Sequence, residues 1–248
     1  MARALRGVLD PGLLTVVVNV GDDTERYGVH VSADPDTVLY TLAGIEGEHG
    51  WGRVGDTTNV MQALAKLGFD TSFTLGDEDY ALCLARTLAL AEGSPLSTTM
   101  QGLSGALGVH DVTLVPASDD PIRTWVRTAS DDWLDFQTYF VDRRHADRIT
   151  AVEYRGAEQA KPAPGVVEAI EAAHTVVIAP SNPPLSIWPI LAVEEIADAV
   201  RTHDSTVAVS PLFGGRALKG PAAEVMAGLG LPEGTAGILD AYAGFVDT

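Results

Sequence analysis

The sequence predicts an α/β fold with a doubly wound, mainly parallel sheet, and three observations support this. Short apolar runs rich in Val and Ile occupy residues 14–20, 174–179 and 206–209, as is typical of strands buried on both faces of a parallel sheet. Helical patterns separate these runs along the chain. Each run also leads into a polar or proline-marked loop, and ligands of open α/β sheets bind at the carboxyl ends of strands. We therefore expect the functional site in these loops.

The composition predicts one folded domain spanning residues 1–248. Of these 248 residues, 46% are hydrophobic, which supplies a packed core that disordered chains lack. Sixteen Lys and Arg oppose 34 Asp and Glu, so that the net charge is −18. Such a charge repels the phosphates of nucleic acids and anionic membrane surfaces, and we expect neither as a partner.

Cysteine usage and hydropathy predict a cytoplasmic protein. Cys83 is the only cysteine, which excludes a disulfide framework within one chain. No apolar run reaches the roughly 18 to 20 residues needed to cross a bilayer, and Met1 is not followed by a secretory apolar region.

Six segments carry helical patterns, and two of them begin with a residue that favours the N-cap. Asp77 and Ser97 are the predicted caps. The predicted helices span residues 57–67, 77–91, 97–107, 164–173, 189–202 and 221–229.

Residues 111–154 are predicted to form a β-rich insertion, because no helical pattern interrupts them. Four short strands are expected there, at residues 112–115, 122–127, 133–140 and 149–154. At the ends of the chain, residues 1–9 are typical of a helix and residues 245–248 of the opening of a strand. We therefore expect a first strand and a last strand to be missing from this sequence.

Two acidic groups follow the first predicted strand. Asp22 and Asp23 lie at its exit, where a hard cation such as Mg²⁺ takes one or two carboxylates and keeps its remaining positions for water and phosphate. A polar turn is the alternative interpretation. Asp36 precedes an apolar helical pattern, and it is either the N-cap of that helix or a ligand for a heterocycle or a ribityl hydroxyl.

Three further polar segments are candidates for binding. Ser118-Asp119-Asp120-Pro121 has the composition of a turn held by a surface ion pair, which is the favoured interpretation from the residues alone. Pro180-Ser181-Asn182-Pro183 follows a buried strand and offers a hydroxyl, an amide and backbone N–H groups. Gly214-Gly215-Arg216 and Lys219 precede a helix with Pro221 in its first turn, an arrangement suited to an anion.

Taken together, the motifs extend in order over most of the chain. They comprise residues 14–19 with Gly21-Asp22-Asp23, 30–32, 36–44, 50–52, 55–57, 75–77, 118–121, 136–140, 180–183 with 186–190, 210–211, 214–215 and 219–221. This ordered set resembles the CofD/FbiA family, the 2-phospho-L-lactate or phosphoenolpyruvate transferases that build coenzyme F-420 from the deazaflavin precursor Fo.

The resemblance implies a Rossmann-like core that binds Fo and a guanosine diphosphate-linked acid, with Mg²⁺ between the phosphates. The terminal ribityl hydroxyl of Fo would attack the phosphorus that carries the acid, and GMP would leave. It further implies a homodimer, with catalytic roles for Asp22 and Asp36 and metal binding by Asp22 and Asp23. The implied substrate-binding residues are Asp36, Thr37, Ser118, Asp119, Asp120, Ser181, Asn182, Pro183, Gly214, Gly215 and Lys219.

Two departures from the family pattern are visible. Glu78 stands in Gly76-Asp77-Glu78-Asp79, where the family has an arginine that helps to hold Fo. The resemblance also implies a glycine-rich opening loop, which we expect to lie before the first residue of this sequence. The motifs do not separate phosphoenolpyruvate from phospholactate as the acid. The alternative function is that of a nucleotide-sugar-binding regulatory protein of the gluconeogenesis-factor type, which would be expected to lack the motifs at residues 118–121 and 180–183.

Overall fold

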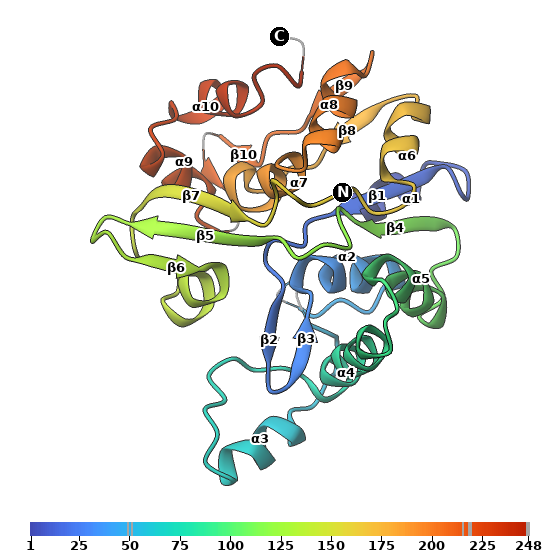
Figure 1. Cartoon of the computed structure of the whole chain (residues 1–248), viewed down its shortest axis with the longest axis vertical. Helices are drawn as coiled ribbons and strands as arrows, with labels where there is room; N and C mark the ends of the chain where they lie inside the picture. The colour runs from blue at the N-terminus through green and yellow to red at the C-terminus, as the bar shows by residue number, and fades with distance from the viewer. Residues whose placement is uncertain (49, 51, 215, 218–219, 247–248) are drawn as a thin grey trace. The chain divides into compact units, whose positions relative to one another are not determined.

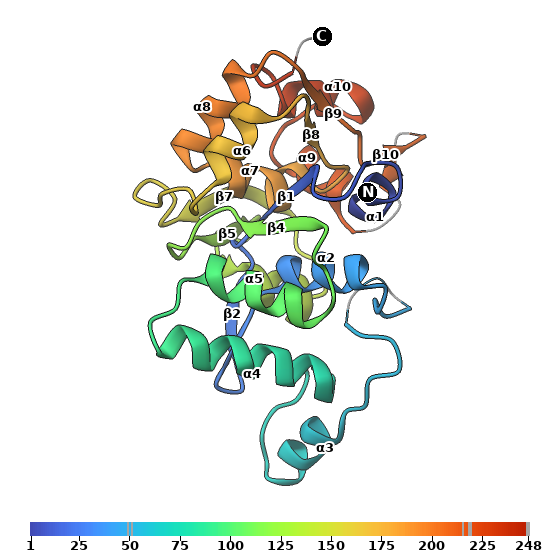
Figure 2. The ribbon, with the colours of Figure 1, turned by 90° about the vertical axis from the view of Figure 1, so that its right-hand side faces the viewer.

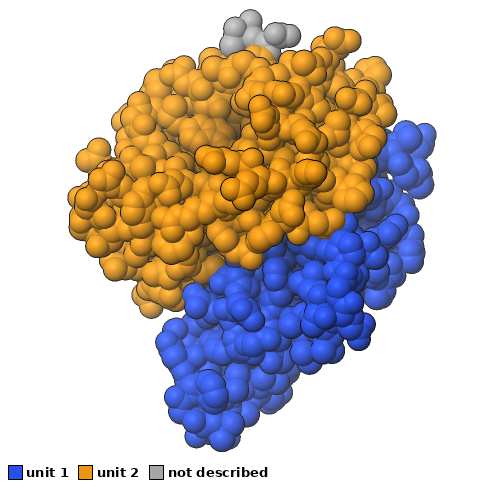
Figure 3. Space-filling model, in the orientation of Figure 1, with its two compact units in different colours: residues 1–18, 22–116 blue, residues 19–21, 117–248 orange. Residues whose placement is uncertain are grey.

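The computed structural model describes residues 1–48, 50, 52–214, 216–217 and 220–246, which group into two compact units. Unit 1 comprises residues 1–18 and 22–116, and unit 2 comprises residues 19–21 and 117–248 (Figure 3). The prediction of a single domain stays a prediction. None of the described helices has the length and apolarity that crossing a membrane requires.

Unit 1 contains one parallel strand pair, a β-hairpin and five α-helices among its described residues (Figures 1 and 2). In chain order these elements are α1 Ala2–Arg6, β1 Leu14–Val18, β2 Thr24–Arg26, β3 Val29–Val31, α2 Ala33–Ala43, α3 Asn59–Lys66, α4 Asp77–Ala91, α5 Leu96–Ala106 and β4 Val112–Pro116. Helices α4 and α5 pack against each other, and α3 contacts α4. Val29, Val31, Met61, Leu75 and Cys83 form a buried apolar cluster that ties the hairpin to α3 and α4.

Unit 2 combines an antiparallel sheet with a second parallel pair and short helices (Figure 1). Its elements are β5 Arg123–Thr128, β6 Trp133–Asp135, the π-helix η1 Thr138–Asp142, β7 Ile149–Arg155, α6 Val166–Ala172, β8 Val176–Ile178, the π-helix η2 Pro183–Ile187, α7 Trp188–Leu191, α8 Glu194–Thr202, β9 Thr206–Ala208, β10 Leu212–Phe213, β11 Arg216–Ala217, α9 Ala222–Gly228 and α10 Gly234–Ala241.

The strand pairings confirm the α/β class. β1 runs parallel to β4, with Leu14 opposite Val112, and β8 runs parallel to β9, with Val176 opposite Thr206. Each parallel pair therefore has an edge at which two carboxyl ends meet, as the predicted site requires. The doubly wound arrangement of these strands stays a prediction.

The predicted β-rich segment at residues 111–154 differs from expectation in two places. Its first strand, β4, pairs with β1 instead of with the other three. The strand expected over residues 133–140 ends at Asp135, because the Asp135 carboxylate accepts hydrogen bonds from the backbone N–H of Thr138 (3.0 Å) and from its hydroxyl (2.6 Å) and turns the chain into η1. The remaining strands form an antiparallel sheet in the order β6-β5-β7.

Several predicted helix boundaries are wrong. The helix expected over residues 189–202 is two helices, α7 and α8, since the chain leaves helical geometry at Val193 and buries that side chain. Helix α5 begins at Leu96 with Pro95 as its N-cap, so Ser97 is not the cap. Helix α10 was not predicted, because Gly234 and Gly237 lower the helical propensity of this segment. Residues 247–248 of the predicted terminal strand lie outside the described residues.

Two carboxylates cap the N-termini of α3 and α4 in exchange, Asp77 from the start of α4 and Asp56 from the segment just before α3. Asp77 was expected to cap α4, but its carboxylate accepts hydrogen bonds from the backbone N–H groups of Asn59 (3.0 Å) and Val60 (2.8 Å), in the first turn of α3. Asp56 accepts the corresponding bonds from Glu78 (2.9 Å) and Asp79 (3.0 Å) in the first turn of α4. Hydrogen bonds to the Asp77 carboxylate lower its pKa to about 2. The largest lowering comes from the Thr57 side chain, and the next largest from the N–H of Val60. We call this pair of carboxylates the reciprocal cap.

The reciprocal cap explains why residue 76 is glycine. A Cβ on Gly76 would overlap the Asp56 carboxylate. We predict that Gly76→Ala lowers the free energy of unfolding by about 1–3 kcal/mol, because it expels a helix cap or strains the chain around it. Urea unfolding measures the change. Gly102→Ala is the matched control, since Gly102 lies inside α5 with open space around it. The control is expected to be neutral or stabilising, and a Gly76→Ala protein as stable as the wild type would refute the steric explanation.

Candidate active site

The loop that follows β1 places two carboxylates in a buried position. Asp22 and Asp23 are 3% and 4% exposed. The loop is held at Gly21, whose N–H donates to the Asn19 side-chain oxygen (2.7 Å) and whose carbonyl accepts from the N–H of Thr124 (2.8 Å). A Cβ at residue 21 would lie 2.5 Å from the Thr124 hydroxyl oxygen. Glycine is therefore required there by close packing.

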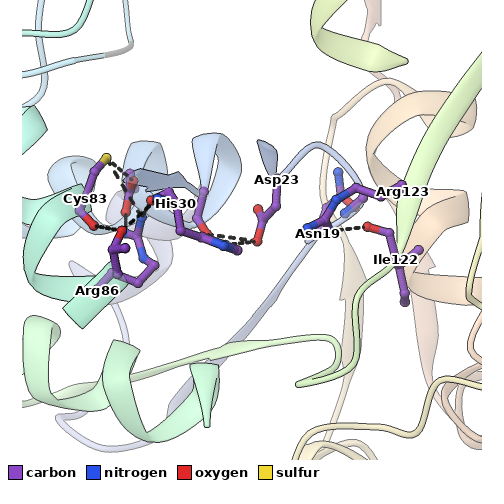
Figure 4. A network of polar contacts seen from close by, with 11 residues as sticks. Asn19, Asp23, His30, Cys83, Arg86, Ile122 and Arg123 are labelled. Carbon is purple, nitrogen blue, oxygen red and sulfur yellow. Dashed lines mark hydrogen bonds and ion pairs between the residues drawn. The ribbon is translucent and has the colours of Figure 1, made fainter. Parts of the chain in front are cut away.

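One oxygen of Asp23 is held by two side chains from the following hairpin. Asp23 Oδ2 accepts a hydrogen bond from the Ser32 hydroxyl (2.9 Å) and lies 2.9 Å from His30 Nε2 (Figure 4). The other oxygen, Oδ1, is buried and has no hydrogen-bond partner among the described residues. A buried carboxylate oxygen without a partner is costly, and a bound cation is one way to satisfy it.

Asp36 forms a buried ion pair and does not cap a helix. Helix α2 begins at Ala33 with Ser32 as its N-cap, which corrects the capping interpretation of Asp36. The Asp36 carboxylate pairs with the guanidinium of Arg86 from α4, and both side chains are almost fully buried. Burial raises the pKa of Asp36 to about 7, while the charge of Arg86 opposes that rise.

Arg86 connects the two acidic positions. Its Nη1 donates to the backbone carbonyl of His30 (3.0 Å), so the residue that contacts Asp23 is held by the same guanidinium that pairs with Asp36 (Figure 4). The structure therefore brings Asp23 and Asp36 into one network through His30 and Arg86.

Asp36, Asp79 and Cys83 form a layer of this network whose oxygen and sulfur atoms could bind a metal ion, but the Arg86 guanidinium already lies beside Asp36. Oxygens of Asp36 and Asp79 and the sulfur of Cys83 lie within 4.8 Å of one another. Tyr40 donates its hydroxyl to Asp79 (2.7 Å), and burial raises the pKa of the Cys83 thiol to about 12. A protonated thiol is a poor metal ligand, and the Arg86 guanidinium supplies the positive charge that the carboxylates need. We interpret this layer as a support for Asp36.

The predicted binding residues 118–120 form a turn that is held by contacts with residues 161–162. The Ser118 hydroxyl donates to the carbonyl of Lys161 (2.5 Å) and accepts from the N–H of Asp120 (3.0 Å), and Asp120 accepts from the N–H of Lys161 (2.9 Å). Asp119 is exposed beside them. These contacts fit the turn interpretation of the motif, and residues 161–162 form the segment that it pairs with.

The motif that follows β8 begins a helix. The Asn182 side-chain oxygen accepts from the N–H of Leu185 (3.3 Å) and so caps η2, whose first residue is the buried Pro183. Ser181 is half-buried in the same loop, and Thr37 is half-buried within α2. Gly214 has a φ of +60° between β10 and β11, whereas Gly215 and Lys219 lie outside the described residues. The roles of these residues toward a substrate stay predictions.

Comparison with known proteins decides the family. The family described as "2-phospho-L-lactate transferase CofD" matches residues 1–247 of this chain. The chain belongs to the CofD family. Its membership agrees with the ordered motifs described above and identifies it as a transferase.

Two similar relatives carry different names. The chain is 40% identical to a "Phosphoenolpyruvate transferase" of Streptomyces griseus over 250 residues, which cover 97% of this chain and 78% of the relative. It is 38% identical to a "2-phospho-L-lactate transferase" of Methanothermobacter thermautotrophicus over 248 residues, which cover 100% of this chain and 79% of the relative.

Solved structures with a similar fold include a protein of the UPF0052 family from Bacillus halodurans. Two crystal structures of that protein align with this chain at TM-scores of 0.56 and 0.62, each with 18% sequence identity. They cover 82% and 99% of this chain, and 62% and 74% of the aligned chain, respectively. At this identity the likeness describes the fold alone.

Glu78, where an arginine is expected in the CofD family, has its own cationic partner. It forms an ion pair with Arg53, whose guanidinium lies 5.7 Å from the centre of the Tyr40 ring. A positive charge is therefore present beside position 78 even though the residue there is acidic. Tyr40 in turn contacts Asp79 of the network described above.

Sequence reasoning missed Arg86, His30 and Ser32 as members of the site. A signal for Arg86 was present, because a single cation on the apolar face of α4 beside Cys83 indicates a buried partner. His30 and Ser32 are two residues apart at the end of a strand, a spacing that places both side chains on one face.

Proposed function

We propose that this chain transfers a phosphoenolpyruvyl or 2-phospho-L-lactyl group from a guanosine diphosphate-linked donor to the ribityl hydroxyl of Fo, releasing GMP, in coenzyme F-420 biosynthesis. Membership of the CofD family over residues 1–247 carries this proposal, and both names of its relatives describe transfer of such a group. The alternative of a nucleotide-sugar-binding regulator is not favoured by these relatives.

The reaction breaks a phosphoanhydride bond of the donor and forms a phosphate ester bond to the acceptor. The ribityl oxygen forms a bond to the phosphorus that carries the acid, the bond between that phosphorus and the bridging oxygen of GMP breaks, and the hydroxyl proton passes to solvent. Such transfers need in-line positioning and neutralisation of charge more than covalent chemistry from the protein. Buried carboxylates beside a cation suit this need.

We propose that Asp22 and Asp23 hold Mg²⁺, which would neutralise charge on the transferring phosphate oxygens. The burial of both carboxylates and the unpartnered Oδ1 of Asp23 support this assignment. Octahedral Mg²⁺ usually binds one or two carboxylates and keeps other positions for water and phosphate. Asp36 would contact Fo from the start of α2, while Ser181, Asn182 and Gly214 would contribute to the nucleotide pocket.

The proposal extends to the assembly and its location. We propose a homodimer in the cytoplasm, with the parallel strands of the fold in a doubly wound arrangement. Size-exclusion chromatography with light scattering tests the dimer, and cell fractionation tests the location.

An activity assay tests the proposed function. We expect the purified protein, incubated with Fo, Mg²⁺ and each guanosine-linked acid in turn, to yield the phosphodiester product and GMP, both detected by mass spectrometry. The donor that gives product identifies which acid the enzyme transfers. A protein that yields no product and leaves the fluorescence of Fo unchanged on mixing would refute the transferase proposal and favour the regulatory alternative.

A further inference from the structure

We infer that His30 and Ser32 are positioning residues, which hold the Asp23 carboxylate in the orientation that presents its Oδ1 to the cation. This inference rests on the proposed function, because it concerns the metal assigned to that site. Neither residue is proposed to touch substrate or metal. They act on Asp23 alone.

The β2–β3 hairpin brings the three side chains together. In its antiparallel register Thr24 lies opposite Val31, so that Asp23, just before β2, meets Ser32, just after β3. His30 and Ser32 are separated by one residue, which places both on the same face of the strand. As a result Asp23 Oδ2, His30 Nε2 and Ser32 Oγ lie mutually within 2.9–3.1 Å.

Ser32 takes part in this cluster instead of capping its helix. It is the N-cap residue of α2, a position where a serine side chain normally accepts a hydrogen bond from the first turn. Here the hydroxyl makes no such bond and donates to Asp23. Helix α2 therefore has no side-chain cap from Ser32, and the fully buried Ser32 hydroxyl binds the Asp23 carboxylate.

His30 is fixed from behind by helix α4. Its backbone N–H donates to the Thr87 hydroxyl (2.7 Å), and its carbonyl accepts from Arg86 (3.0 Å), which is paired with Asp36. The Thr87 hydroxyl is itself anchored on the carbonyl of Cys83 (2.7 Å). Helix α4 therefore holds both the backbone N–H and the backbone carbonyl of the residue whose imidazole contacts Asp23.

The two hydrogen bonds to Asp23 Oδ2 fix the direction in which Asp23 Oδ1 points. With Oδ2 occupied, rotation of the carboxylate would break both hydrogen bonds, so the buried Oδ1 keeps one direction. Hydrogen bonds to metal-binding carboxylates commonly orient them, and their loss typically costs about 10- to 100-fold in metal affinity. Removal of either donor is therefore expected to weaken cation binding without removing a ligand.

Binding of Mn²⁺ to the substrate-free protein, followed by electron paramagnetic resonance at one fixed pH, tests the inference. Mn²⁺ accepts the same oxygen ligands as Mg²⁺. We expect His30→Ala and Ser32→Ala each to raise the Kd for Mn²⁺ about 10-fold. His30→Gln, which retains an N–H donor, and Ser32→Cys, which retains the size and a weak donor, are expected to lie closer to the wild type.

The controls separate this inference from folding and from the proposed function. His110→Gln alters an exposed histidine of unit 1 and is expected to leave the Kd unchanged. Variants are compared only where circular dichroism shows native secondary structure. Folded alanine variants that bind Mn²⁺ like the wild type would overturn the inference even if the enzyme makes product, as would a wild-type protein that binds no Mn²⁺. A wild-type protein that binds Mn²⁺, loses affinity in the alanine variants and yet makes no product would support it while refuting the proposed function.

Discussion

Replacing Arg86 by methionine is expected to lower the free energy of unfolding by about 3–5 kcal/mol at pH 8. The substitution leaves the Asp36 carboxylate buried without its cation, and breaking one side of a buried ion pair typically costs this much. It also removes the donor to the His30 carbonyl. Urea unfolding of the two proteins at several pH values measures the effect.

The loss caused by Arg86→Met is expected to shrink as the pH falls. In the wild type the pKa of Asp36 is about 7, above the value of about 3.9 for an unfolded chain. The folded state therefore binds this proton more tightly, and Asp36 contributes stability below about pH 4 that is lost as the pH rises through 7. Without Arg86 the pKa rises further, so Asp36 is neutral at pH 5 in both proteins.

An exposed ion pair supplies the control for this prediction. Arg127→Met removes the partner of Asp131 in unit 2, where both side chains face solvent, and is expected to cost no more than about 1 kcal/mol. An Arg86→Met protein that loses as little as this control at pH 8, or loses equally at pH 5 and pH 8, would contradict the buried-pair explanation.

Asp22→Asn and Asp23→Asn are each expected to lower kcat/KM for the proposed transfer by at least about 100-fold. Each variant keeps the size of the side chain and removes one negative charge from the cation site, and metal stabilisation of a phosphoryl transition state amounts to several kcal/mol. Initial rates over a range of Mg²⁺ concentrations measure the loss. Partial recovery at high Mg²⁺ is expected, because a weakened site still binds at sufficient concentration.

An exposed aspartate controls for the general loss of negative charge. Asp70 accepts a hydrogen bond from the N–H of Ser72 on the surface of unit 1, and Asp70→Asn is expected to leave turnover unchanged. Full Mg²⁺-dependent turnover in Asp22→Asn would remove that residue from the metal site, and the same result in Asp23→Asn would remove the other.

The local pattern of the sequence was sufficient for the class of fold. Runs of branched apolar residues predicted the strands at residues 14–18, 176–178 and 206–208, because branched side chains favour an extended chain. The expected burial on both faces is wrong for β8 and β9, where Val177 and Val207 are 37% and 48% exposed. The 15-residue helix α4 was predicted with both ends correct, since a long periodic segment outweighs the uncertainty at its ends.

Contacts between distant segments were beyond the reach of that pattern. The pairing of β4 with β1 joins residues almost one hundred positions apart, and nothing within residues 112–116 indicates which neighbour they choose. The same limit applies to Asp77, which has the composition of a cap for its own helix and caps another one. Local propensity identifies a side chain that can cap a helix. It does not identify which helix supplies the N–H groups.

The candidate site was predicted in part. The motifs placed Asp22 and Asp23 in the loop after the first strand, as the structure has them, whereas Asp36 lies within α2 and not before it. The partners that fix these carboxylates, His30, Ser32 and Arg86, follow from the hairpin register and from helix packing. Such contacts have no fixed spacing in sequence.

The reciprocal cap of α3 and α4 makes the two helix starts depend on each other. If α3 unravels, Asp77 loses the N–H groups it accepts, and the displaced chain around Asp56 exposes the first turn of α4. The free energy of opening either end is therefore expected to include part of the cost of opening the other, and we expect residues 56–79 to open together in local unfolding. With its pKa held near 2, the Asp77 carboxylate is expected to keep capping α3 at acidities that protonate an ordinary surface aspartate.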